Sequence, residues 1–569
     1  MNLVKSDIML IALLLALNLL VFSPALKGDF IWDDRDLILD NPFIQSSSFF
    51  KEVLVSPFDE LITENEAGKK FEGRTHFYRP LTIMSYRLDY QIWGFNPAGF
   101  HLTNILIHTL NTILFFFIAS GLGFKRIYAF FSAALFSLYP LHFENTAWIS
   151  GRTDLLSFLF AAVAVLFFLK YLKKKTNLNL LLSTFFFLLS LLSKENCFLL
   201  PILFFLFLRL DNKSLKKSLI RITPYVFSMV TWLIMRQLVL KPTPLQFSWK
   251  SFVNMFSMMG FYTFKSLFPF HLSISVDSLD IIPNDIFLVM GLIVSVAVFI
   301  LGVLVILKKN TAKIYLTIVA FYLLLFPSLL VLFVDTARST VAWRFLYASS
   351  AVLMGLLVYG FTKVIKSRHF LSILIVLLGL VYVSELYPKT VFFGQKEKDF
   401  WINMENIERE SLVIQFNAAA KILFVDENKA LMVFNHILEK EKNHPRYADY
   451  QELIHETLAS YYSSKGDFQK AKSYYECIIK SNKPANIEFY FNYATFLSLT
   501  GNDGKAKSIV ADLLRRYPGN HKILSMAAKF HIRLKEYEKA VSLLTEDYRL
   551  FNTEESLGLL NLLNQKSKE

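Results

Sequence analysis

The run Ile8-Met-Leu-Ile-Ala-Leu-Leu-Leu-Ala-Leu-Asn-Leu-Leu-Val-Phe22 is apolar at every position except Asn18, and Lys5 precedes it. A basic residue before such a run is typical of a signal peptide or a signal anchor. Ser23-Pro24-Ala25 offers only a weak cleavage site. Cleavage there would detach the apolar helix from the polar segment that follows it. We therefore predict an uncleaved signal anchor.

The polar segment after this run begins Phe30-Ile-Trp-Asp-Asp-Arg-Asp-Leu-Ile-Leu-Asp-Asn-Pro42. It places two adjacent carboxylates, Asp33 and Asp34, just beyond the membrane end of a hydrophobic helix. Ionisable groups at such a boundary lose hydration and are more often functional than groups on a free surface. A structural role for both, solvating a loop or capping a helix, stays open at this point.

The composition is that of a polytopic membrane protein. Of the 569 residues, 54% are hydrophobic and 57 are Phe, many of them in runs long enough to cross a bilayer. The net charge of +14 does not indicate nucleic acid, because Lys and Arg cluster between apolar runs in the positive-inside pattern. Cys197 and Cys477 lie in very different segments, which argues against a disulfide framework or a metal site.

Ten more apolar runs follow a polar segment at about residues 27–100, where we expect short helices on the membrane surface. They lie near 101–120, 127–140, 153–172, 177–192, 197–210, 222–240, 285–307, 312–334, 343–362 and 369–387. Alternation of basic clusters between them predicts about eleven spans, a cytoplasmic N-terminus and an external 27–100 loop. The stretch 252–268 would break this alternation, so we expect an interfacial or re-entrant helix there.

From about Lys396 the composition changes to that of a soluble helical array. Small residues recur at spacings near 34 residues, at Ala430, Ala471, Ala506 and Ala540. This spacing is typical of tetratricopeptide repeats, in which each helix pair buries its core only against its neighbours. The predicted fold is all-α, a polytopic helix bundle over 1–390 followed by a tetratricopeptide-repeat solenoid over 396–569 on the external side.

Unusual polar residues gather in the segments that alternation places outside. These segments contain Asp33 and Asp34, then Arg74, His76 and Arg79, then His142 to Asp154, Ser193 to Asn196, His271 to Asp285, and Asp335 to Arg344. The cytoplasmic segments contain little beyond Lys and Arg. Several external loops with paired acids and bases near helix ends predict one site at the outer interface.

The second span carries a polar stripe. His101, Asn104, His108 and Asn111 are spaced three, four and three residues apart, so they share one helical face. Hydrogen bonds between helices are the structural explanation for such a stripe, and we favour that explanation for Asn111. His101 and Asn104, near the outer end, are expected to reach the site.

This arrangement suits sugar transfer from a lipid phosphate. A carboxylate beside the membrane can act as general base on a hydroxyl acceptor. Four cationic side chains, those of Arg79, Arg152, Lys194 and Arg344, can hold and neutralise a phosphate leaving group. With base and leaving group on opposite faces of the sugar, transfer inverts the anomeric carbon. The sequence has no P-loop, dinucleotide-binding glycine motif, GxSxG or zinc-type spacing.

Five stretches carry a family resemblance. They are Tyr78-Arg-Pro-Leu-Thr82, Asn96-Pro-Ala-Gly-Phe-His-Leu-Thr-Asn104, His142 to Leu155, Ser193-Lys-Glu195 and Trp343-Arg-Phe-Leu-Tyr347. The chain resembles the transmembrane and tetratricopeptide-repeat O-mannosyltransferase family over nearly its whole length. Trp-Ile-Ser-Gly-Arg-Thr-Asp, ending at Asp154, is the most specific of the matching motifs.

The resemblance implies a C-type glycosyltransferase fold, a polyprenyl-phosphate sugar donor and inverting transfer to Ser or Thr hydroxyls of a protein. Related enzymes use an Asp-Glu pair in the first external loop, and Asp33-Asp34 stands in that place here. Either Asp is the expected base. His101, Asn104, His142, Glu144, Asp154 and Glu195 are expected to shape the sugar or acceptor pocket. The partner of Arg344 stays open, because Ala-Trp precedes it where an acidic residue is expected.

The size of the chain suggests a bacterial protein of the inner membrane, with the donor sugar mannose or another sugar on undecaprenyl phosphate. The repeat array would bind the acceptor protein. Two alternatives remain: the same chemistry on a lipid or polysaccharide acceptor, and a non-enzymatic scaffold anchored by its spans. Asp-rich loops suit a divalent cation, but no ligand spacing defines a site, so we predict no obligatory metal.

Overall fold

A computed structural model describes residues 5–41, 44–45, 77–210, 214–240, 247–274, 285–307, 312–333, 341–407, 412–440, 447–480, 487–551 and 554–566. Arg74, His76 and parts of the predicted external segments after His271 and before Arg344 lie outside these residues. The described residues contain helices and no strand, as predicted. They form two compact units, one ending at Lys396 and the other beginning at Glu397; residues 35–41 and 44–45 cluster with the second unit.

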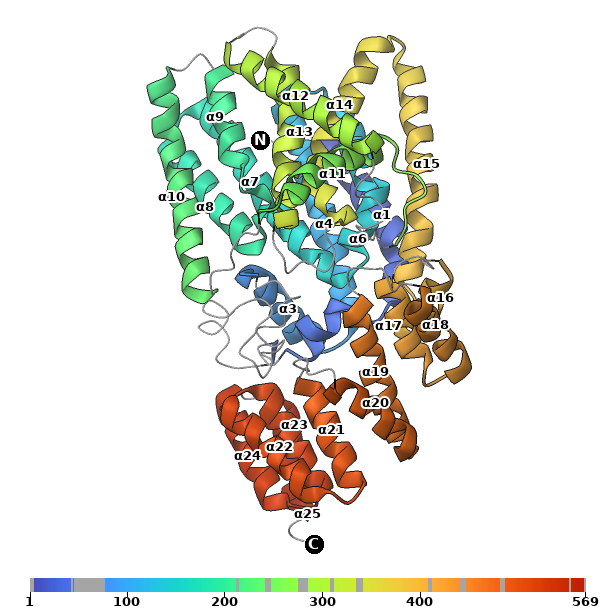
Figure 1. Ribbon diagram of the computed structural model, residues 1–569. Coiled ribbons are helices and arrows are strands. Elements are labelled where there is room, and N and C mark those ends of the chain that lie inside the picture. The colour runs from blue at the N-terminus through green and yellow to red at the C-terminus, as the bar shows by residue number, and fades with distance from the viewer. Residues whose placement is uncertain are drawn as a thin grey trace. The chain divides into compact units, whose positions relative to one another are not determined.

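The first unit is a bundle of apolar helices (Figure 1). Eight helices in the described part of the chain are long and apolar enough to cross a membrane. They are α1 (Lys5–Phe22), α4 (Pro97–Gly121), α7 (Arg152–Lys174), α10 (Leu215–Val239), α12 (Asp285–Leu307), α13 (Ala312–Leu329), α14 (Tyr347–Val364) and α15 (Arg368–Phe393). The membrane bundle predicted from the sequence is thus confirmed.

Three predicted spans form shorter helices. These are α5 (Arg126–Ser137), α8 (Asn177–Ser193) and α9 (Leu200–Leu210), of 12, 17 and 11 residues. An 11-residue helix is about 16 Å long, roughly half of the hydrocarbon thickness. All eleven predicted runs therefore form helices, and within the described residues eight of these helices have the length and composition of a full crossing.

The stretch that breaks the alternation forms α11 (Trp249–Leu267), which is not one of these eight helices. It packs on α12 with the two backbones in contact. A Cβ atom on Gly260 would lie 2.0 Å from the carbonyl oxygen of Phe287, and one on Gly291 would lie 1.8 Å from that of Phe256. Only glycine fits at both positions, because real Cβ contacts are never this short. Whether α11 lies in the interface stays a prediction.

Helix direction separates the polar residues from the basic clusters. Helix α7 begins at Arg152 and ends with Lys173 and Lys174 in its last turn. Its 23 residues span about 35 Å, a little more than the hydrocarbon core. Helix α4 likewise begins near His101 and ends just before Lys125. The predicted site residues thus lie at one end of these helices, and the basic residues lie at the other.

The described part of the first polar loop contains the short helices η2 (Arg35–Leu39) and α3 (Pro80–Trp93). Helix α3 begins at Pro80, a residue favoured at the first helical position because its missing N–H would have no partner there. Its start places Arg79 directly before the helix, and its buried face carries Tyr86 and Asp89. The expected short helices are present in this part of the loop.

The second unit is a series of paired helices. It comprises α16 (Glu397–Ile407), α17 (Leu412–Ile422), α18 (Glu427–Lys440), α19 (Tyr447–Ser464), α20 (Phe468–Lys480), α21 (Ile487–Leu499), α22 (Asp503–Arg516), α23 (His521–Arg533), α24 (Tyr537–Phe551) and α25 (Glu554–Lys566). The four small residues Ala430, Ala471, Ala506 and Ala540 are fully buried. They allow neighbouring helices to approach closely, as the repeat pattern predicts.

Contacts between repeats recur at the repeat length. The hydroxyl of Tyr461 donates to Glu427 at 2.8 Å, and Lys522 donates to Glu488 at 2.5 Å; each pair is 34 residues apart. Two polar contacts thus join neighbouring helix pairs at the spacing of one repeat. The tetratricopeptide prediction agrees with this helical array.

One buried carboxylate joins the last three helices of the array. Asp547 on α24 is fully buried; one oxygen lies 2.7 Å from Nδ1 of His521 on α23, and the other accepts from Ser556 on α25. We expect Asp547→Ala to destabilise this region by about 2 kcal/mol, because it leaves the polar groups of His521 and Ser556 without their buried partner. Hydrogen exchange of the α23–α25 amides in the full-length protein measures the change. Asp512→Ala, which removes only surface ion pairs, should cost less than about 1 kcal/mol. Equal effects of the two changes would contradict this expectation.

Candidate functional site

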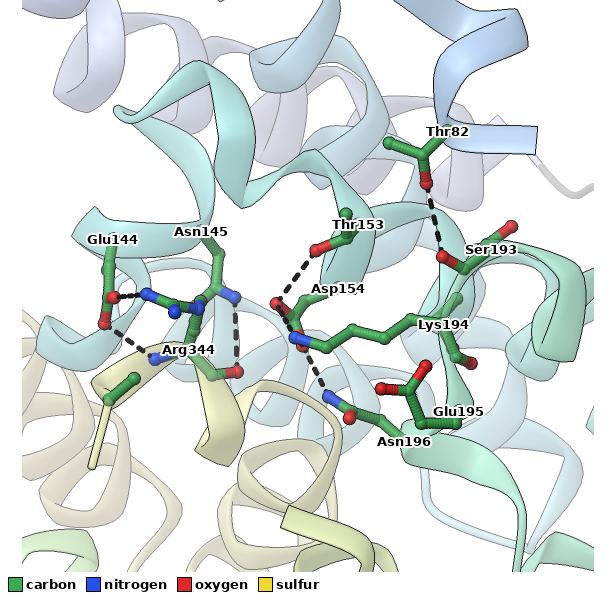
Figure 2. A network of polar contacts seen from close by, with 12 residues as sticks. Thr82, Glu144, Asn145, Thr153, Asp154, Ser193, Lys194, Glu195, Asn196 and Arg344 are labelled. Carbon is green, nitrogen blue, oxygen red and sulfur yellow. Dashed lines mark hydrogen bonds and ion pairs between the residues drawn. The ribbon is translucent and has the colours of Figure 1, made fainter. Parts of the chain in front are cut away.

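Polar side chains from four segments far apart in the sequence meet at one end of the bundle (Figure 2). Two lie between α5 and α7, on α6 (Phe143–Thr146), and two lie in the first turn of α7. A third group lies between α8 and α9, at η6 (Glu195–Cys197), and the fourth segment is η8 (Trp343–Leu346) before α14. Five of the predicted site residues are therefore neighbours in space: Glu144, Asp154, Lys194, Glu195 and Arg344.

Lys194 and Asp154 form a buried ion pair at the centre of Figure 2. The Lys194 ammonium lies 2.8 and 2.7 Å from the two oxygens of Asp154, and the amide of Asn196 donates to the same carboxylate at 2.5 Å. Burial lowers the pKa of Lys194 to about 8; Asp154 opposes this change, while the positive charges of Arg79 and Arg344 add to it. Three cations are therefore close enough to influence one another.

Arg344 takes Glu144 as its partner. The guanidinium pairs with one carboxylate oxygen of Glu144, and the Arg344 backbone N–H donates to the other at 2.9 Å. Asn145, the next residue, donates to the Arg344 carbonyl at 3.3 Å. The partner that the sequence left open is thus 200 residues away on α6. The Arg344 side chain keeps 23% of its surface exposed.

The segment before Arg344 is held by α11. The hydroxyl of Tyr262 accepts from the Ala342 N–H at 3.0 Å and donates to the Ala342 carbonyl at 3.1 Å. The Trp343 indole donates to the Ser273 carbonyl at 2.9 Å. The backbone next to Arg344 is therefore fixed by a helix outside the four segments.

Arg79 supplies the third cation. It donates to Glu195 at 2.7 Å, and the Glu195 side chain is 36% exposed. Partial burial would raise the pKa of Glu195, but the charge and hydrogen bond of Arg79 lower it to about 2. Glu195 thus stays ionised at neutral pH and keeps Arg79 in place beside Lys194.

Arg152 lies elsewhere. Its side chain is fully buried, 2.5 Å from Asp89, and it donates to the Asn104 side chain at 2.7 Å and to the Phe100 carbonyl at 2.9 Å. Its guanidinium also lies over the ring of Tyr86. These contacts give Arg152 a structural role in joining α3, α4 and α7. A phosphate bound by Arg152 would have to displace these contacts, and the phosphate-binding role of Arg152 stays a prediction.

Asp34 and Asp33 have opposite environments. Asp34 is fully buried; one of its oxygens accepts from the N–H and the hydroxyl of Ser150, and the other accepts from the Ile31 N–H at 3.1 Å. Burial raises the pKa of Asp34 to about 7, although these hydrogen bonds lower it. Asp33 is exposed, and its charge acts on Arg344. The structure thus distinguishes the two carboxylates by their burial, which the sequence alone could not do.

The polar stripe on α4 joins helices, as predicted for Asn111. The amide of Asn111 donates to the Leu155 carbonyl and to the Tyr347 hydroxyl, which also lies 2.6 Å from Nδ1 of His108. Asn104 donates to the carbonyls of Trp148 and Ile149. His101 is buried close to Gly28. The two residues expected to reach the site are therefore buried, and the Asn104 side chain binds other parts of the protein.

His142 is also fully buried, with Nε2 2.9 Å from the Ser350 hydroxyl. Residues that the sequence reasoning missed include Asp89, Ser150, Asn196 and Tyr347. Three of them lie in or next to the quoted motifs, which was the available signal. Asp89 lies within α3, and nothing in its local sequence indicates a charged partner.

The motif Trp148-Ile-Ser-Gly-Arg-Thr-Asp154 has a structural explanation. Ser150 binds Asp34, Arg152 binds Asp89, and Asp154 binds Lys194. A Cβ on Gly151 would lie 2.3 Å from the Glu144 carbonyl oxygen, so the turn leaves room only for glycine. Alternate residues of one short stretch thus connect three other segments. No group of three or more potential metal-ligating side chains occurs among the described residues.

The raised pKa of Asp34 predicts a pH-dependent stability. Its folded-state pKa is about 7 and its unfolded value is near 3.8, so the folded protein binds more protons between these values. Stability is therefore fully present below pH 4 and is lost as the pH rises through 7, by about 1 kcal/mol per pH unit. Melting temperatures in detergent from pH 5 to 8 should show this loss in the wild type and less of it in Asp34→Asn. Parallel pH profiles for the two proteins would contradict the assignment.

Part of the membrane bundle is similar to known proteins. Residues 80–238 match the family model described as dolichyl-phosphate-mannose-protein mannosyltransferase. The chain is 32% identical over 176 residues to Protein O-mannosyl-transferase TMTC4 of Mus musculus, covering 28% of this chain and 23% of that protein. It is 34% identical over 159 residues to TMTC1 of Mus musculus, covering 27% and 16%.

A relative from Caenorhabditis elegans, Protein O-mannosyl-transferase F38B6.6, is 29% identical over 164 residues, covering 28% of this chain and 22% of that protein. The matches thus span less than a quarter of the length of these relatives. The family model covers α3, α4 and α7 and includes Asp154 and Lys194; Arg79 directly precedes the matched residues. Residues 80–238 thus resemble the dolichyl-phosphate-mannose-protein mannosyltransferase family.

Proposed function

We propose that the chain is an inverting membrane glycosyltransferase that moves a sugar, mannose or a similar hexose, from a polyprenyl-phosphate donor to a Ser or Thr hydroxyl of a protein. The observation that carries the proposal is an exposed carboxylate, Asp33, whose charge acts on Arg344, one of three cations grouped at one end of the bundle. The carboxylate offers a base, and the cations offer charge for a phosphate. The names of the matched relatives agree with sugar transfer to proteins.

Asp33 is the better candidate for the base. A general base must reach the hydroxyl whose proton it accepts, and Asp33 is exposed. Asp34 is fully buried and already accepts three hydrogen bonds. We assign Asp34 the role of fixing the turn that carries Asp33.

Arg344, Arg79 and Lys194 would bind the donor phosphate. Arg344 is partly exposed and uses one guanidinium nitrogen for Glu144, and a guanidinium has five N–H donors. Arg79 and Lys194 are nearly buried and paired, so they contribute mainly positive charge behind Arg344. Glu144, Asp154 and Glu195 hold these cations in place, and Glu195, the most exposed of the three, is the one best placed to contact sugar hydroxyls.

The reaction then follows from the two sides of the site. The acceptor hydroxyl loses its proton to the Asp33 carboxylate as its oxygen bonds to the anomeric carbon. The bond from that carbon to the phosphate oxygen breaks, and the polyprenyl phosphate leaves with the electron pair. Its added negative charge is stabilised by the cations. Attack opposite the leaving group inverts the configuration. The residues present supply both the base and the charge, so we propose no obligatory metal.

The helix ends support an orientation. Lys173 and Lys174 lie about 35 Å from the site end of α7, on the side that the positive-inside rule assigns to the cytoplasm. We therefore propose a cytoplasmic N-terminus and an external site. The repeat array would bind the acceptor protein outside, as such arrays commonly bind peptides. A bacterial inner membrane, with undecaprenyl phosphate as the lipid, remains our proposal for the location.

The base assignment predicts the effect of single carboxylate changes. Asp33→Asn should lower kcat about 100-fold or more, because general-base catalysis contributes roughly that factor. Transfer of radiolabelled sugar from purified polyprenyl-phosphate sugars to membrane proteins measures the rate. Asp36→Asn, in the same segment, is the matched control and should stay within about twofold of the wild type. A normal rate in Asp33→Asn would exclude Asp33 as the base.

The phosphate site predicts a binding defect. Arg344→Gln should raise the KM for the donor about tenfold or more, since one lost charged contact is worth about 1.4 kcal/mol or more. Lys363→Gln, at the other end of α14, serves as control and should leave this KM unchanged. Label appearing in lipid rather than protein would change the proposed acceptor. If no donor gave any label with folded protein, the scaffold hypothesis would replace the enzyme.

A further inference from the structure

The segment that carries Asp33 touches the end of α15, backbone against backbone. A Cβ atom on Gly28 would lie 2.4 Å from the carbonyl oxygen of Phe393. A Cβ on Gly394 would lie 2.2 Å from the carbonyl oxygen of Pro24. The absence of a side chain on each glycine thus allows the other chain segment to approach. Neither contact can accommodate a side chain without movement.

Space, and not backbone conformation, requires glycine at these positions. Gly28 has φ −67° and Gly394 has φ −81°, values that any residue adopts. Alanine at either position would therefore leave the local backbone unstrained. Its shortest contact at either position would be with the backbone of the other segment, and on Gly28 the Cβ would also lie 3.0 Å from Nε2 of His101. Gly394→Ala is therefore the more direct steric test of the contact.

Several other contacts join the same two chain segments, residues 21–32 and residues 390–396. The rings of Trp32 and Phe393 are 6.4 Å apart, and the Thr390 hydroxyl donates to the Val21 carbonyl at 3.1 Å. Lys396 pairs with Asp29 at 2.9 Å. The contact thus extends along both segments, and in the first segment it ends at Trp32, one residue before Asp33.

In the sequence, Asp33 lies between this contact and Asp34, whose side chain is held by hydrogen bonds from Ser150 and Ile31. Trp32, its neighbour on one side, has φ +51°, an unusual conformation for a bulky residue, and its ring also packs against Trp148 at 5.6 Å. On the other side, Asp34 is fixed by Ser150. An outward shift of Trp32 would therefore turn the Asp33 carboxylate away from its present direction.

We infer that Gly28 and Gly394 are positioning residues for Asp33: their backbone contact with the end of α15 sets the direction of the carboxylate. This inference rests on the proposed role of Asp33 as the base. The segment of Gly394 continues through Lys396 into Glu397, where the chain enters the second unit. The segment of Asp33 continues into Arg35, which also belongs to the second unit and pairs with Glu397 at 3.4 Å. Both segments of the contact are therefore directly continuous with the repeat-containing unit.

The test uses Gly394→Ala with Gly360→Ala as the matched control, because a Cβ on Gly360 meets nothing within 4 Å. We expect Gly394→Ala to lower kcat for sugar transfer about tenfold or more and to leave the donor KM within twofold. The KM should hold because Arg79, Lys194 and Arg344 make no part of the contact. Gly28→Ala should behave like Gly394→Ala, and the double variant should be little worse than either. An unchanged kcat, or a donor KM that rises with the fall in kcat, overturns the inference.

A second measurement does not depend on activity. The amides of Ile31 and Ser150 both donate to Asp34, so their hydrogen exchange reports the turn that holds Asp33. Gly394→Ala should accelerate exchange at these two amides and leave the α4 and α7 amides unchanged. Normal exchange at both, or acceleration throughout the bundle, refutes the inference. If the wild type transferred no sugar, the proposed function would fail, and this measurement would still decide the contact.

An exposed pair provides a variant that should fold in any case. Lys396→Glu places like charges at the Asp29 contact, where the two side chains are 65% and 33% exposed. It should lower kcat by a few fold, and the exchanged pair Asp29→Lys with Lys396→Glu should restore it. Failure of the exchange to restore kcat, or no effect of the single change, counts against the inference.

Discussion

The first unit depends on the buried guanidinium of Arg152. A fully buried charge is tolerated only when its donors are satisfied, and here Asp89, Asn104 and a backbone carbonyl satisfy them. These partners lie on α3 and α4, while Arg152 begins α7. One side chain thus fixes the mutual position of three helices, and its neighbours Ser150 and Asp154 then reach the first loop and Lys194.

Around this anchor, each cation of the site has its own carboxylate from a different segment. The pairs Arg79–Glu195, Lys194–Asp154 and Arg344–Glu144 alternate in sign, so their charges cancel in the absence of a ligand. Such pairing lets three positive side chains lie near one another at low cost in free energy. An arriving phosphate would meet cations that are already oriented, which reduces the reorganisation needed during transfer.

Sequence reasoning found the fold and most of the charged residues, for identifiable reasons. Spans follow from apolar length, repeats from small-residue spacing, and Arg79, Lys194 and Arg344 from charges at helix boundaries. The burial of Arg152 could not be predicted, because it depends on Asp89, 63 residues earlier, and no local pattern reveals such a pair. Asp33 and Asp34 are chemically identical neighbours, so only the three-dimensional contact with Ser150 distinguishes them. The lengths of α5, α8 and α9 likewise depend on packing.

The hydrogen bonds of Tyr262 have a mechanical consequence. Its one hydroxyl holds both backbone groups of Ala342, two residues before Arg344. Its helix, α11, lies against α12 with backbones in contact at Gly260 and Gly291, so neither helix can slide without the other. The outward side chains of α12, such as Phe299 at 73% exposure, face the surroundings of the bundle. A displacement of α12 is therefore expected to move α11 with it, and Tyr262 would pass this movement on to the backbone of Ala342 and so to Arg344.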